Sequence, residues 1–459
     1  MNYRKLIKRL TVDEDEYTQL KRAFQGGFTH ANSMWVNEII TESDYGKIYS
    51  MDFTSSYPYV LLSEQFPMGK AKRVKVKSDA QLDKLLKNYC CLFDLELWKV
   101  KPKKFNENYI SQSRCSHLER GVINNGRVSS ADYLCTTVTE QDFEIIKEYY
   151  SVEGYAVRNM VVYDKGYLPI NFIKAMLNLY QKKTELKGVE GKEVEYLNSK
   201  EQLNSMYGMC VTDICRPEIV YSEEWEKNVP DFKEAISKNN KSRKRFLFYP
   251  WGVWVTAYAR RNLFKAISEL GDDYIYSDTD SVKFLNLDAH KQFFDNYNQE
   301  VFKRLNSIAS NRGLNFAQMA PFTKDGKQKM IGVWDYEGYY TMFKTLGAKR
   351  YMVVKDNKLS LTVSGLNKRT AIPYLFDKYV TVENIFKHFD LGLYIPSKFT
   401  GKLTHTYIDE PFETFVRDYK GVIAKVSEQS YVHLEPAEFS LDIADEFIKF
   451  LQGGRDEQI

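Results

Sequence analysis

Two aspartates one residue apart give the strongest chemical signal in the sequence. Asp278 and Asp280 lie in the run YSDTDS, within a segment over 274–284 that is predicted to form a strand, a turn and a second strand. Residues two apart in such a segment point to the same side, and two crowded carboxylates repel each other unless a cation lies between them. A hard cation that prefers oxygen ligands, such as Mg²⁺, suits that position. An ordinary turn built from Asp and Thr explains the pair equally well, so both interpretations stay open.

A further carboxylate, Asp52, follows the run KIYSM and precedes the turn residues TSSYP. The stretch 46–62 is predicted to form a strand that turns over Ser55–Pro58. A single aspartate at the end of a strand usually caps a turn. Two-metal phosphoryl transfer, however, draws its carboxylates from separate segments, which together hold ions about 3.5–4 Å apart. Asp52 is therefore a second candidate for the same chemistry.

The third candidate lies on a predicted helix that runs from about residue 193 to 209. Lys200, Asn204, Tyr207 and Gly208 are spaced i, i+4, i+7 and i+8, so they share one face of that helix. A face that carries an ammonium, an amide, a phenol and then a bare glycine can bind a triphosphate and let a base pair pass. This combination is unusual on an ordinary surface helix, although one such match does not decide the function.

These candidates need elements that hold them in place. A helix is predicted from Pro169 to Leu186, because apolar residues recur there at i, i+3, i+4 and i+7, and the loop KGVEGK joins it to the helix at 193–209. The other predicted elements are a strand over 88–99, an irregular stretch over 211–248, a helix over 252–270 and mostly helical structure after about residue 375. This order of strands and helices predicts an α+β fold rather than a doubly wound sheet.

Composition narrows the class of protein. The chain has 459 residues with 43% hydrophobic content, which is enough for several cores and, by length, for roughly three domains. With 65 Lys and Arg against 61 Asp and Glu, the net charge of +4 gives little indication of a polyanionic partner. No apolar run reaches the ~20 residues of a membrane-spanning helix, and the first ten residues do not form a signal peptide. The six cysteines lack zinc-binding spacing, so we expect reduced thiols in a cytoplasm.

Taken together, the three blocks resemble the polymerase motifs of the family B DNA polymerases: Asp-x-x-Ser-x-Tyr-Pro, Lys-x-x-x-Asn-Ser-x-Tyr-Gly and Tyr-x-Asp-Thr-Asp, in the family's order. Three more segments are similar to family motifs: Phe24–Gly27 to Tyr-x-Gly-Gly, Thr256–Arg260 to Thr-x-x-(Gly/Ala)-Arg, and Lys349–Tyr351 to Lys-x-Tyr. Phe24 replaces the family's tyrosine, which keeps the ring and loses the hydroxyl group. The resemblance runs from about residue 20 to 370, in particular to the protein-primed branch of small bacteriophages.

The resemblance implies a role for each matched residue. The catalytic carboxylates would be Asp52, Asp278 and Asp280, and two Mg²⁺ ions (Mn²⁺ as a substitute) would be held by Asp52, Asp280 and the backbone carbonyl of Phe53. Residues implied to bind the incoming nucleotide are Ser55, Tyr57, Lys183, Lys200, Asn204 and Tyr207, with Tyr57 as the steric gate under the sugar. Residues implied to bind DNA are Gly26, Gly27, Thr256, Arg260, Lys349 and Tyr351.

The resemblance also implies an architecture, that of a right-hand polymerase with an antiparallel palm sheet. The expected divisions are a palm over 1–66 and 249–372, a first insertion over 67–166, fingers over 167–210, a second insertion over 211–248 and a thumb over 373–459. The first insertion would help to receive a priming protein. The second would serve strand displacement, with a β-like lobe that closes a ring around the template.

The implied function is template-directed DNA synthesis in the cytoplasm of a bacterial host, protein-primed and strand-displacing, for a phage or mobile-element genome. The implied partners are primer-template DNA, deoxynucleotides, a terminal (priming) protein, and a separate exonuclease and single-strand-binding protein, with no membrane. Because the chain begins about two dozen residues before the diglycine motif, we expect it not to proofread by itself.

Two other functions remain in competition. A catalytically silent DNA-binding or protein-binding subunit is one, although Asp52, Asp280 and Lys200 argue against it. A nucleotide-sugar glycosyltransferase that uses Asp-x-Asp is the other, but it does not explain the face of the helix that carries Lys200 and Asn204.

Four further segments carry weaker signals. Asp94-Leu95-Glu96 is similar to an exonuclease Asp-x-Glu, yet it follows the first polymerase motif, and we expect an ordinary strand with alternating faces. Arg114–His117 lacks a second pair of metal ligands and is predicted to be a loop. The basic runs at 70–77 and 241–245 are equally compatible with solvated surface and with contact to phosphates.

Overall fold

A five-stranded sheet forms the centre of the computed structural model, which describes residues 3–103, 108–221, 225–408, 412–417, 423–428 and 431–441. Its strand order is β1-β14-β15-β3-β16, and all neighbours are antiparallel. The strands are β1 (Thr29–Ala31), β3 (Ile48–Phe53), β14 (Tyr274–Asp278), β15 (Ser281–Phe284) and β16 (Trp334–Tyr340). Strands from both halves of the chain therefore meet in one sheet, and the expected α+β fold with an antiparallel central sheet is confirmed.

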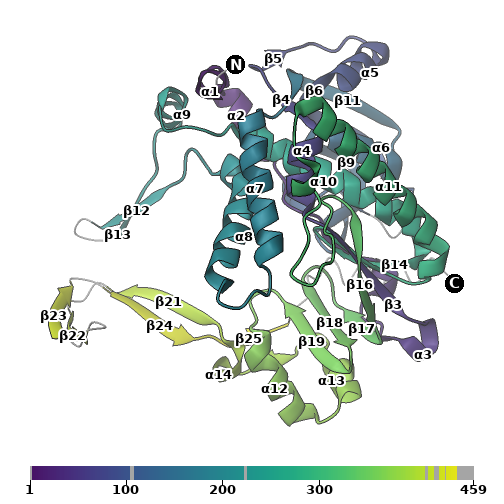
Figure 1. Cartoon of the computed structure of the whole chain (residues 1–459), viewed down its shortest axis with the longest axis vertical. Helices are drawn as coiled ribbons and strands as arrows, with labels where there is room; N and C mark the ends of the chain where they lie inside the picture. The colour runs from purple at the N-terminus through teal and green to yellow at the C-terminus, as the bar shows by residue number, and fades with distance from the viewer. Residues whose placement is uncertain are drawn as a thin grey trace.

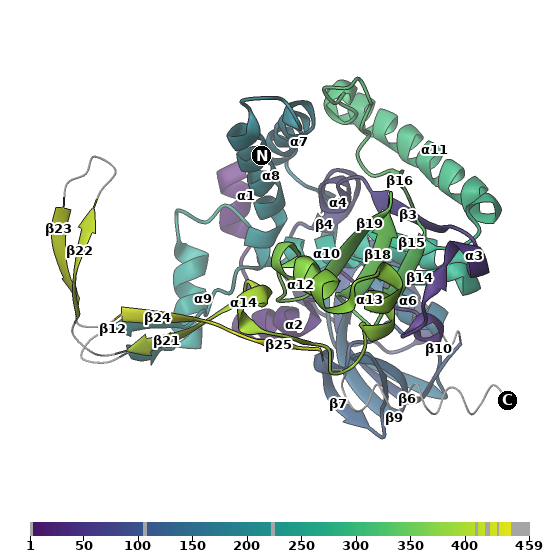
Figure 2. The ribbon, with the colours of Figure 1, turned by 90° about the horizontal axis from the view of Figure 1, so that it is seen from below.

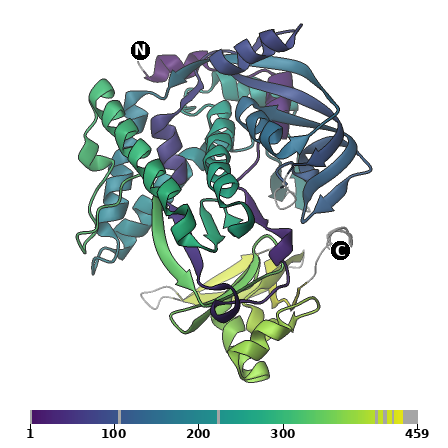
Figure 3. The ribbon, with the colours of Figure 1, turned by 90° about the vertical axis from the view of Figure 1, so that its right-hand side faces the viewer.

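Helices cover this sheet. The buried α10 (Tyr249–Leu270) is apolar around most of its circumference, with Trp251 and Trp254 fully enclosed, as expected of a helix at the centre of a core. The long α11 (Leu287–Arg312) contacts α4, α10 and the edge strand β16 (Figure 3). The remaining helices near the N-terminus are α1 (Tyr3–Arg9), α2 (Glu14–Ala23), α3 (Glu42–Tyr45) and α4 (Ser56–Ser63).

Two antiparallel helices, α7 (Ile170–Leu186) and α8 (Glu193–Gly208), form a hairpin at the bounds that the sequence pattern predicts. They run side by side, and their connecting turn points toward the C-terminal elements (Figure 1). The apolar stripe of α7 is buried, whereas α8 buries only Ser199 and Leu203. The hairpin is therefore anchored through α7, and most of α8 stays accessible.

Residues 65–167 form a separate sheet of eight strands, on the upper right in Figure 3. Its strands are β4 (Gln65–Pro67), β5 (Lys72–Arg73), β6 (Tyr89–Pro102), β7 (Cys115–Glu119), β8 (Val122–Asn124), β9 (Arg127–Thr139), β10 (Tyr150–Ser151) and β11 (Gly154–Tyr167), with helices α5 (Asp79–Asn88) and α6 (Glu140–Tyr149). Asp94 and Glu96 share one face of β6 and pair with Arg22 and Arg158, so this segment is the ordinary strand that was expected. The loop predicted at 114–117 is wrong: most of it is strand β7, paired with β9.

The stretch 211–248, predicted to be irregular, contains regular structure. A short hairpin of β12 (Glu218–Tyr221) and β13 (Trp225–Asn228) projects from the body, and α9 (Phe232–Lys241) follows. The α9 helix begins where the Asp231 side chain accepts a hydrogen bond from the Glu234 amide at 2.7 Å. A four-stranded sheet of β2 (Ile40–Thr41), β17 (Met342–Thr345), β18 (Arg350–Lys355) and β19 (Lys358–Val363) lies beside the central one.

The expectation of mostly helical structure after residue 375 is wrong. Only α12 (Lys368–Tyr379), α13 (Val382–His388) and α14 (Ser397–Thr400) are helical in the described part of this region. The described strands are β20 (Tyr394–Ile395), β21 (Leu403–Ile408), β22 (Phe412–Arg417), β23 (Ile423–Glu428), β24 (Tyr431–Pro436) and β25 (Phe439–Ser440). β-branched and aromatic residues are frequent there, which favours strands. The resulting ribbon extends away from the body (Figure 2).

None of the described helices combines the length and the apolar character that crossing a membrane requires.

Candidate active site

Asp52 and Asp280 meet at the centre of the five-stranded sheet. Asp52 lies in β3 opposite Ser281, which follows Asp280 in the turn between β14 and β15. The Phe53 amide donates a hydrogen bond to the Asp280 carbonyl at 2.6 Å, which joins the two segments directly. Burial and the neighbouring Asp280 raise the pKa of Asp52 to about 7, and burial and Asp278 raise the pKa of Asp280 to about 6. These shifts indicate a crowded negative site that a cation would relieve.

The third aspartate, Asp278, has a partner within the protein. Lys349 Nζ contacts both carboxylate oxygens, at 2.6 Å for Oδ2, and Thr29 Oγ1 donates to Oδ1 at 3.1 Å. The Lys349 amide donates to the Tyr276 hydroxyl at 3.0 Å, and the Tyr351 ring packs 4.9 Å from the Tyr276 ring. The Lys-x-Tyr segment is thus placed directly beside the aspartates.

The diglycine segment packs on the Asp-Thr-Asp turn. The Thr279 amide donates to the Phe28 carbonyl at 2.7 Å. A Cβ atom on Gly27 would lie 2.5 Å from the Thr279 methyl group, so this position accepts only glycine unless the turn moves. Gly26 has open space at the same position. The close approach therefore fixes the second glycine and leaves the first one accessible.

Thr256 and Arg260, expected to contact DNA directly, are buried in α10. Thr256 donates its hydroxyl to backbone carbonyls of its own helix. The Arg260 side chain is 1% exposed and pairs with Asp142 at 2.7 Å. Arg260 also donates to the carbonyls of Gln25 and Gly26, at 2.7 and 2.9 Å. Arg260 is therefore buried behind the diglycine segment and supports it through these two hydrogen bonds.

The nucleotide candidates lie between α4 and the helical hairpin. Lys183 on α7 donates to Ser55 Oγ at 3.1 Å, at the left-handed residue where α4 begins. Burial, Lys200 and Lys187 lower the pKa of Lys183, which places Lys200 close by. The Tyr57 ring on α4 and the Tyr207 ring on α8 lie 4.1 Å apart, so these two helices meet there. Lys200 and Asn204 are exposed on the same helix, α8.

The structure adds three charged residues that sequence reasoning missed. Asp335 in β16 lies opposite Asp52, and Glu337 accepts a hydrogen bond from Ser50 Oγ at 3.2 Å. Lys283 is buried and donates to the same Ser50 oxygen at 2.9 Å. The alternation of acidic residues in the run WDYEGYY could have indicated a strand with one acidic face.

Within the described ranges, no three carboxylate, histidine or cysteine side chains are placed closely enough to hold a metal ion together. The predicted metal ligands are two carboxylates and a backbone carbonyl, so this finding does not decide their role.

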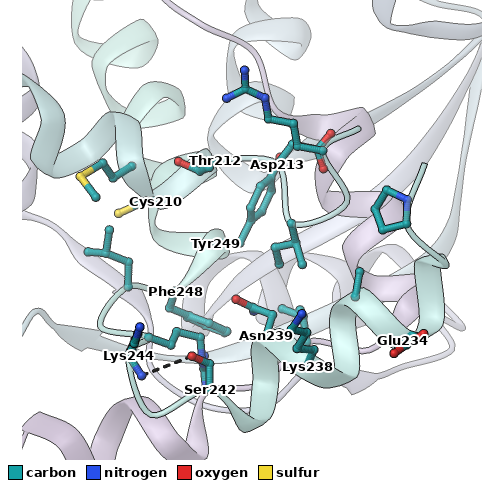
Figure 4. Close-up of a pocket in the computed structure, with 18 of the residues that line it drawn as sticks. Cys210, Thr212, Asp213, Glu234, Lys238, Asn239, Ser242, Lys244, Phe248 and Tyr249 are labelled. Atoms are coloured by element: carbon teal, nitrogen blue, oxygen red, sulfur yellow. Dashed lines mark hydrogen bonds between the residues drawn. The ribbon is translucent and has the colours of Figure 1, made fainter. Parts of the chain in front are cut away.

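A separate hollow of about 820 Å³ lies between α9 and the segment that precedes α10 (Figure 4). Asp213 and Tyr249 line one side of it, and Lys238 and Asn239 on α9 line the other. None of the predicted site residues lines this hollow, so it lies apart from Asp52, Asp278 and Asp280.

Comparisons with known proteins give the family of this chain. The family model for DNA polymerase type B, organellar and viral, matches residues 1–299. The DNA polymerase of Bacillus phage PZA is 26% identical over 293 residues, and that of Bacillus phage phi29 is 25% identical over 294 residues. Each match covers 61% of this chain and 44% of the relative, so the matched part spans less than half of those proteins.

The solved structures give the same fold. The orthorhombic crystal form of Phi29 DNA polymerase has a TM-score of 0.58 at 18% identity, covering 95% of this chain and 65% of that one. Its complex with primer-template DNA and incoming nucleotide substrates has a TM-score of 0.56 at 18% identity, with the same coverage. The chain belongs to the organellar and viral type B DNA polymerase family.

Proposed function

We propose that this chain is a template-directed DNA polymerase that adds deoxynucleotides to a primer 3′ end. The observation that carries the proposal is the placement of Asp52 on β3 beside Asp280 in the turn between β14 and β15, with Lys183 at the adjacent Ser55 and Lys349 at Asp278. One site thus combines carboxylates with lysines from two separate segments. The relatives named DNA polymerase and the solved complex with primer-template DNA and nucleotides support DNA and deoxynucleotides as partners.

The donor set fits a hard divalent cation. Asp52, Asp280 and the Phe53 carbonyl supply only oxygen atoms, and burial together with neighbouring aspartates raises the pKa of both carboxyl groups. We propose that these groups hold two Mg²⁺ ions, for which Mn²⁺ substitutes. When bound, such ions stabilise the charge that develops on the transferring phosphoryl group.

The protein's own groups would position the reactants, because phosphoryl transfer depends mostly on positioning and electrostatics. Lys183 and Lys200 would bind the triphosphate, and the Tyr57 ring would exclude a 2′-hydroxyl. Lys349 and the diglycine segment would hold the primer strand. The primer 3′-oxygen bonds to the α-phosphorus, the bond to the bridging oxygen breaks, pyrophosphate leaves with that electron pair, and the hydroxyl proton passes to water.

The finer features of the proposal concern the two insertions. We propose that residues 67–166 receive a terminal protein for protein priming and that 211–248 serve strand displacement, with a separate single-strand-binding protein. The projecting β12–β13 hairpin supports the second assignment, because it stands clear of the body on the side of the helical hairpin (Figure 1). We assign the region from residue 373 onward, as far as the structure describes it, to a thumb.

We propose no exonuclease activity for Asp94 and Glu96, since each is paired with an arginine on an ordinary strand. A separate exonuclease would then supply editing.

Primer extension on a singly primed circular template with Mg²⁺ tests the proposal. Extension and its product length report chemistry and processivity, and synthesis beyond one circle reports strand displacement. Absence of any extension, while primer-template binding persists, would favour a catalytically silent DNA-binding subunit instead.

A further inference from the structure

A loop rich in lysine lies beside the turn at which the nucleotide candidates meet. This lysine loop, residues 321–333, leads into β16. The Gly332 amide donates to the Thr54 carbonyl at 2.8 Å, and the Thr54 amide donates to the Val333 carbonyl at 2.9 Å. The loop is therefore joined to the residue that precedes Ser55, where Lys183 binds.

The same loop is joined to the helical hairpin. The Tyr180 hydroxyl, on α7 one turn before Lys183, donates to the Lys329 carbonyl at 2.8 Å. Lys324 Nζ reaches the Gly188 carbonyl at 3.4 Å, near the turn between α7 and α8. These contacts place the lysine loop along α7 on one side and along the Thr54–Ser55 turn on the other.

Two lysines of this loop gather on a single carboxylate next to the catalytic pair. Lys327 Nζ lies 3.0 Å from Asp335 Oδ1, and Lys329 Nζ contacts Asp335 Oδ2. Asp335 lies directly opposite Asp52 on the neighbouring strand, where paired side chains share a face and their Cβ atoms lie about 4.5–5.5 Å apart. Two ammonium groups therefore share one carboxylate on the strand next to Asp52.

The two lysines differ in exposure. The Lys329 side chain is 28% exposed and the Lys327 side chain is 57% exposed, so the pair leads from the site toward solvent. Neither Lys327 nor Lys329 takes part in the triphosphate binding that is proposed for Lys183 and Lys200.

We propose that Lys327 and Lys329 bind inorganic pyrophosphate as it leaves the site, a role that rests on the polymerase function proposed above. Lys183, the group proposed to bind the triphosphate, lies at Ser55, and the lysine loop is hydrogen-bonded to the preceding Thr54. Pyrophosphate released beside Ser55 would therefore leave next to the lysine loop. Pyrophosphate carries several negative charges, and it would compete with the single carboxylate of Asp335 for the two ammonium groups. A charge-assisted contact to phosphate oxygen is about twice as strong as a neutral one.

Equilibrium titration of the DNA-free protein with inorganic pyrophosphate and Mg²⁺ tests this site without any need for extension. K329Q and K327Q should each weaken pyrophosphate binding about tenfold, whereas K329R should restore it. K99Q is the matched control, because Lys99 pairs with Asp132 at 2.8 Å with similar exposure on the outer sheet. In extension assays, inhibition by added pyrophosphate should weaken by the same factor.

D335N separates binding from a merely structural role. If the lysines bind pyrophosphate, removing the carboxylate that competes for them should leave that binding unchanged or strengthen it. A loss with D335N as large as with K329Q would mean that the lysines only hold Asp335, and the proposal would fail. Pyrophosphate binding by K329Q and K327Q equal to that of the parent would also overturn it. A parent chain that binds pyrophosphate through these lysines but does not extend primers would contradict the polymerase function and not this site.

Discussion

Arg260→Met removes a guanidinium group that is 1% exposed and pairs with Asp142, which is 0% exposed. Four of the hydrogen bonds that Arg260 donates reach three separate segments of the chain. The acceptors are Asp142 Oδ1 at 2.7 Å, the Tyr109 hydroxyl at 2.7 Å, and the carbonyls of Gln25 and Gly26 at 2.7 and 2.9 Å. Removing one partner of a buried ion pair costs about 3–5 kcal/mol, because the other charge stays buried without compensation. We expect the free energy of unfolding to fall by that amount.

Urea denaturation of the parent and the variant measures the loss, and primer-template affinity reports its functional part. We expect weaker DNA binding, since the diglycine segment loses the donor that holds it. The matched control is Arg261→Met. Arg261 pairs with Glu64 at 2.8 Å, but Arg304 contacts the same carboxylate at 3.0 Å, so no buried charge is left alone. If Arg260→Met destabilises the protein no more than Arg261→Met, the reasoning is refuted.

The pair also predicts a pH dependence. Although burial opposes its ionisation, Arg260 and the hydrogen bonds of Tyr109 and Thr139 hold the pKa of Asp142 below its usual range. A carboxyl whose pKa is lower in the folded state contributes stability above its unfolded pKa and loses it as the pH falls through the folded pKa. The parent should therefore lose stability in acid more steeply than Arg260→Met, as thermal unfolding between neutral pH and strong acid would measure. Equal slopes would contradict this.

Three shorter predictions concern the proposed polymerase. Asp52→Ala and Asp280→Ala should abolish primer extension and keep primer-template binding within about threefold, since neither carboxylate is expected to contact phosphate; near-parental extension would contradict the metal assignment. Tyr57→Val should raise ribonucleotide incorporation in single-nucleotide assays, and an unchanged ratio of ribo- to deoxynucleotide would place the gate elsewhere. Replacing 218–228 by a short Gly/Ser bridge should abolish synthesis through duplex DNA and spare gap filling, and equal losses in both would argue against a role in strand displacement.

The residues of the proposed site could be grouped from the sequence because they are encoded in short spacings. Asp278 and Asp280 share a turn, and Lys200 shares a helix face with Asn204 and Tyr207, so local geometry already groups them. Asp335 could not be assigned in the same way. Its place opposite Asp52 depends on the register between β16 and β3, which lie far apart in the chain.

Two differences between the sequence-based expectations and the structure have separate physical causes. Arg260 sits in a motif that resembles a DNA contact, but its partner Asp142 comes from α6 in the outer sheet, which no local pattern indicates. The C-terminal region was predicted to be helical because its apolar residues are sparse. The strands β21–β24 contain many β-branched and aromatic residues, and these favour strands even where apolar residues are sparse.

The strand order of the central sheet has a consequence for how the protein folds during synthesis. The bond between Lys283 and Ser50 joins residues 233 positions apart, and that between Ser50 and Glu337 joins residues 287 positions apart. Strand β3 therefore leaves the ribosome long before β15 and β16 exist to pair with it. Such non-local pairing slows folding, because the chain loses the conformational entropy of a long loop before the stabilising contacts form. The eight-stranded sheet over 65–167, whose strands are all close in sequence, can form first, and nascent chains arrested before residue 340 should contain this sheet without the completed carboxylate site.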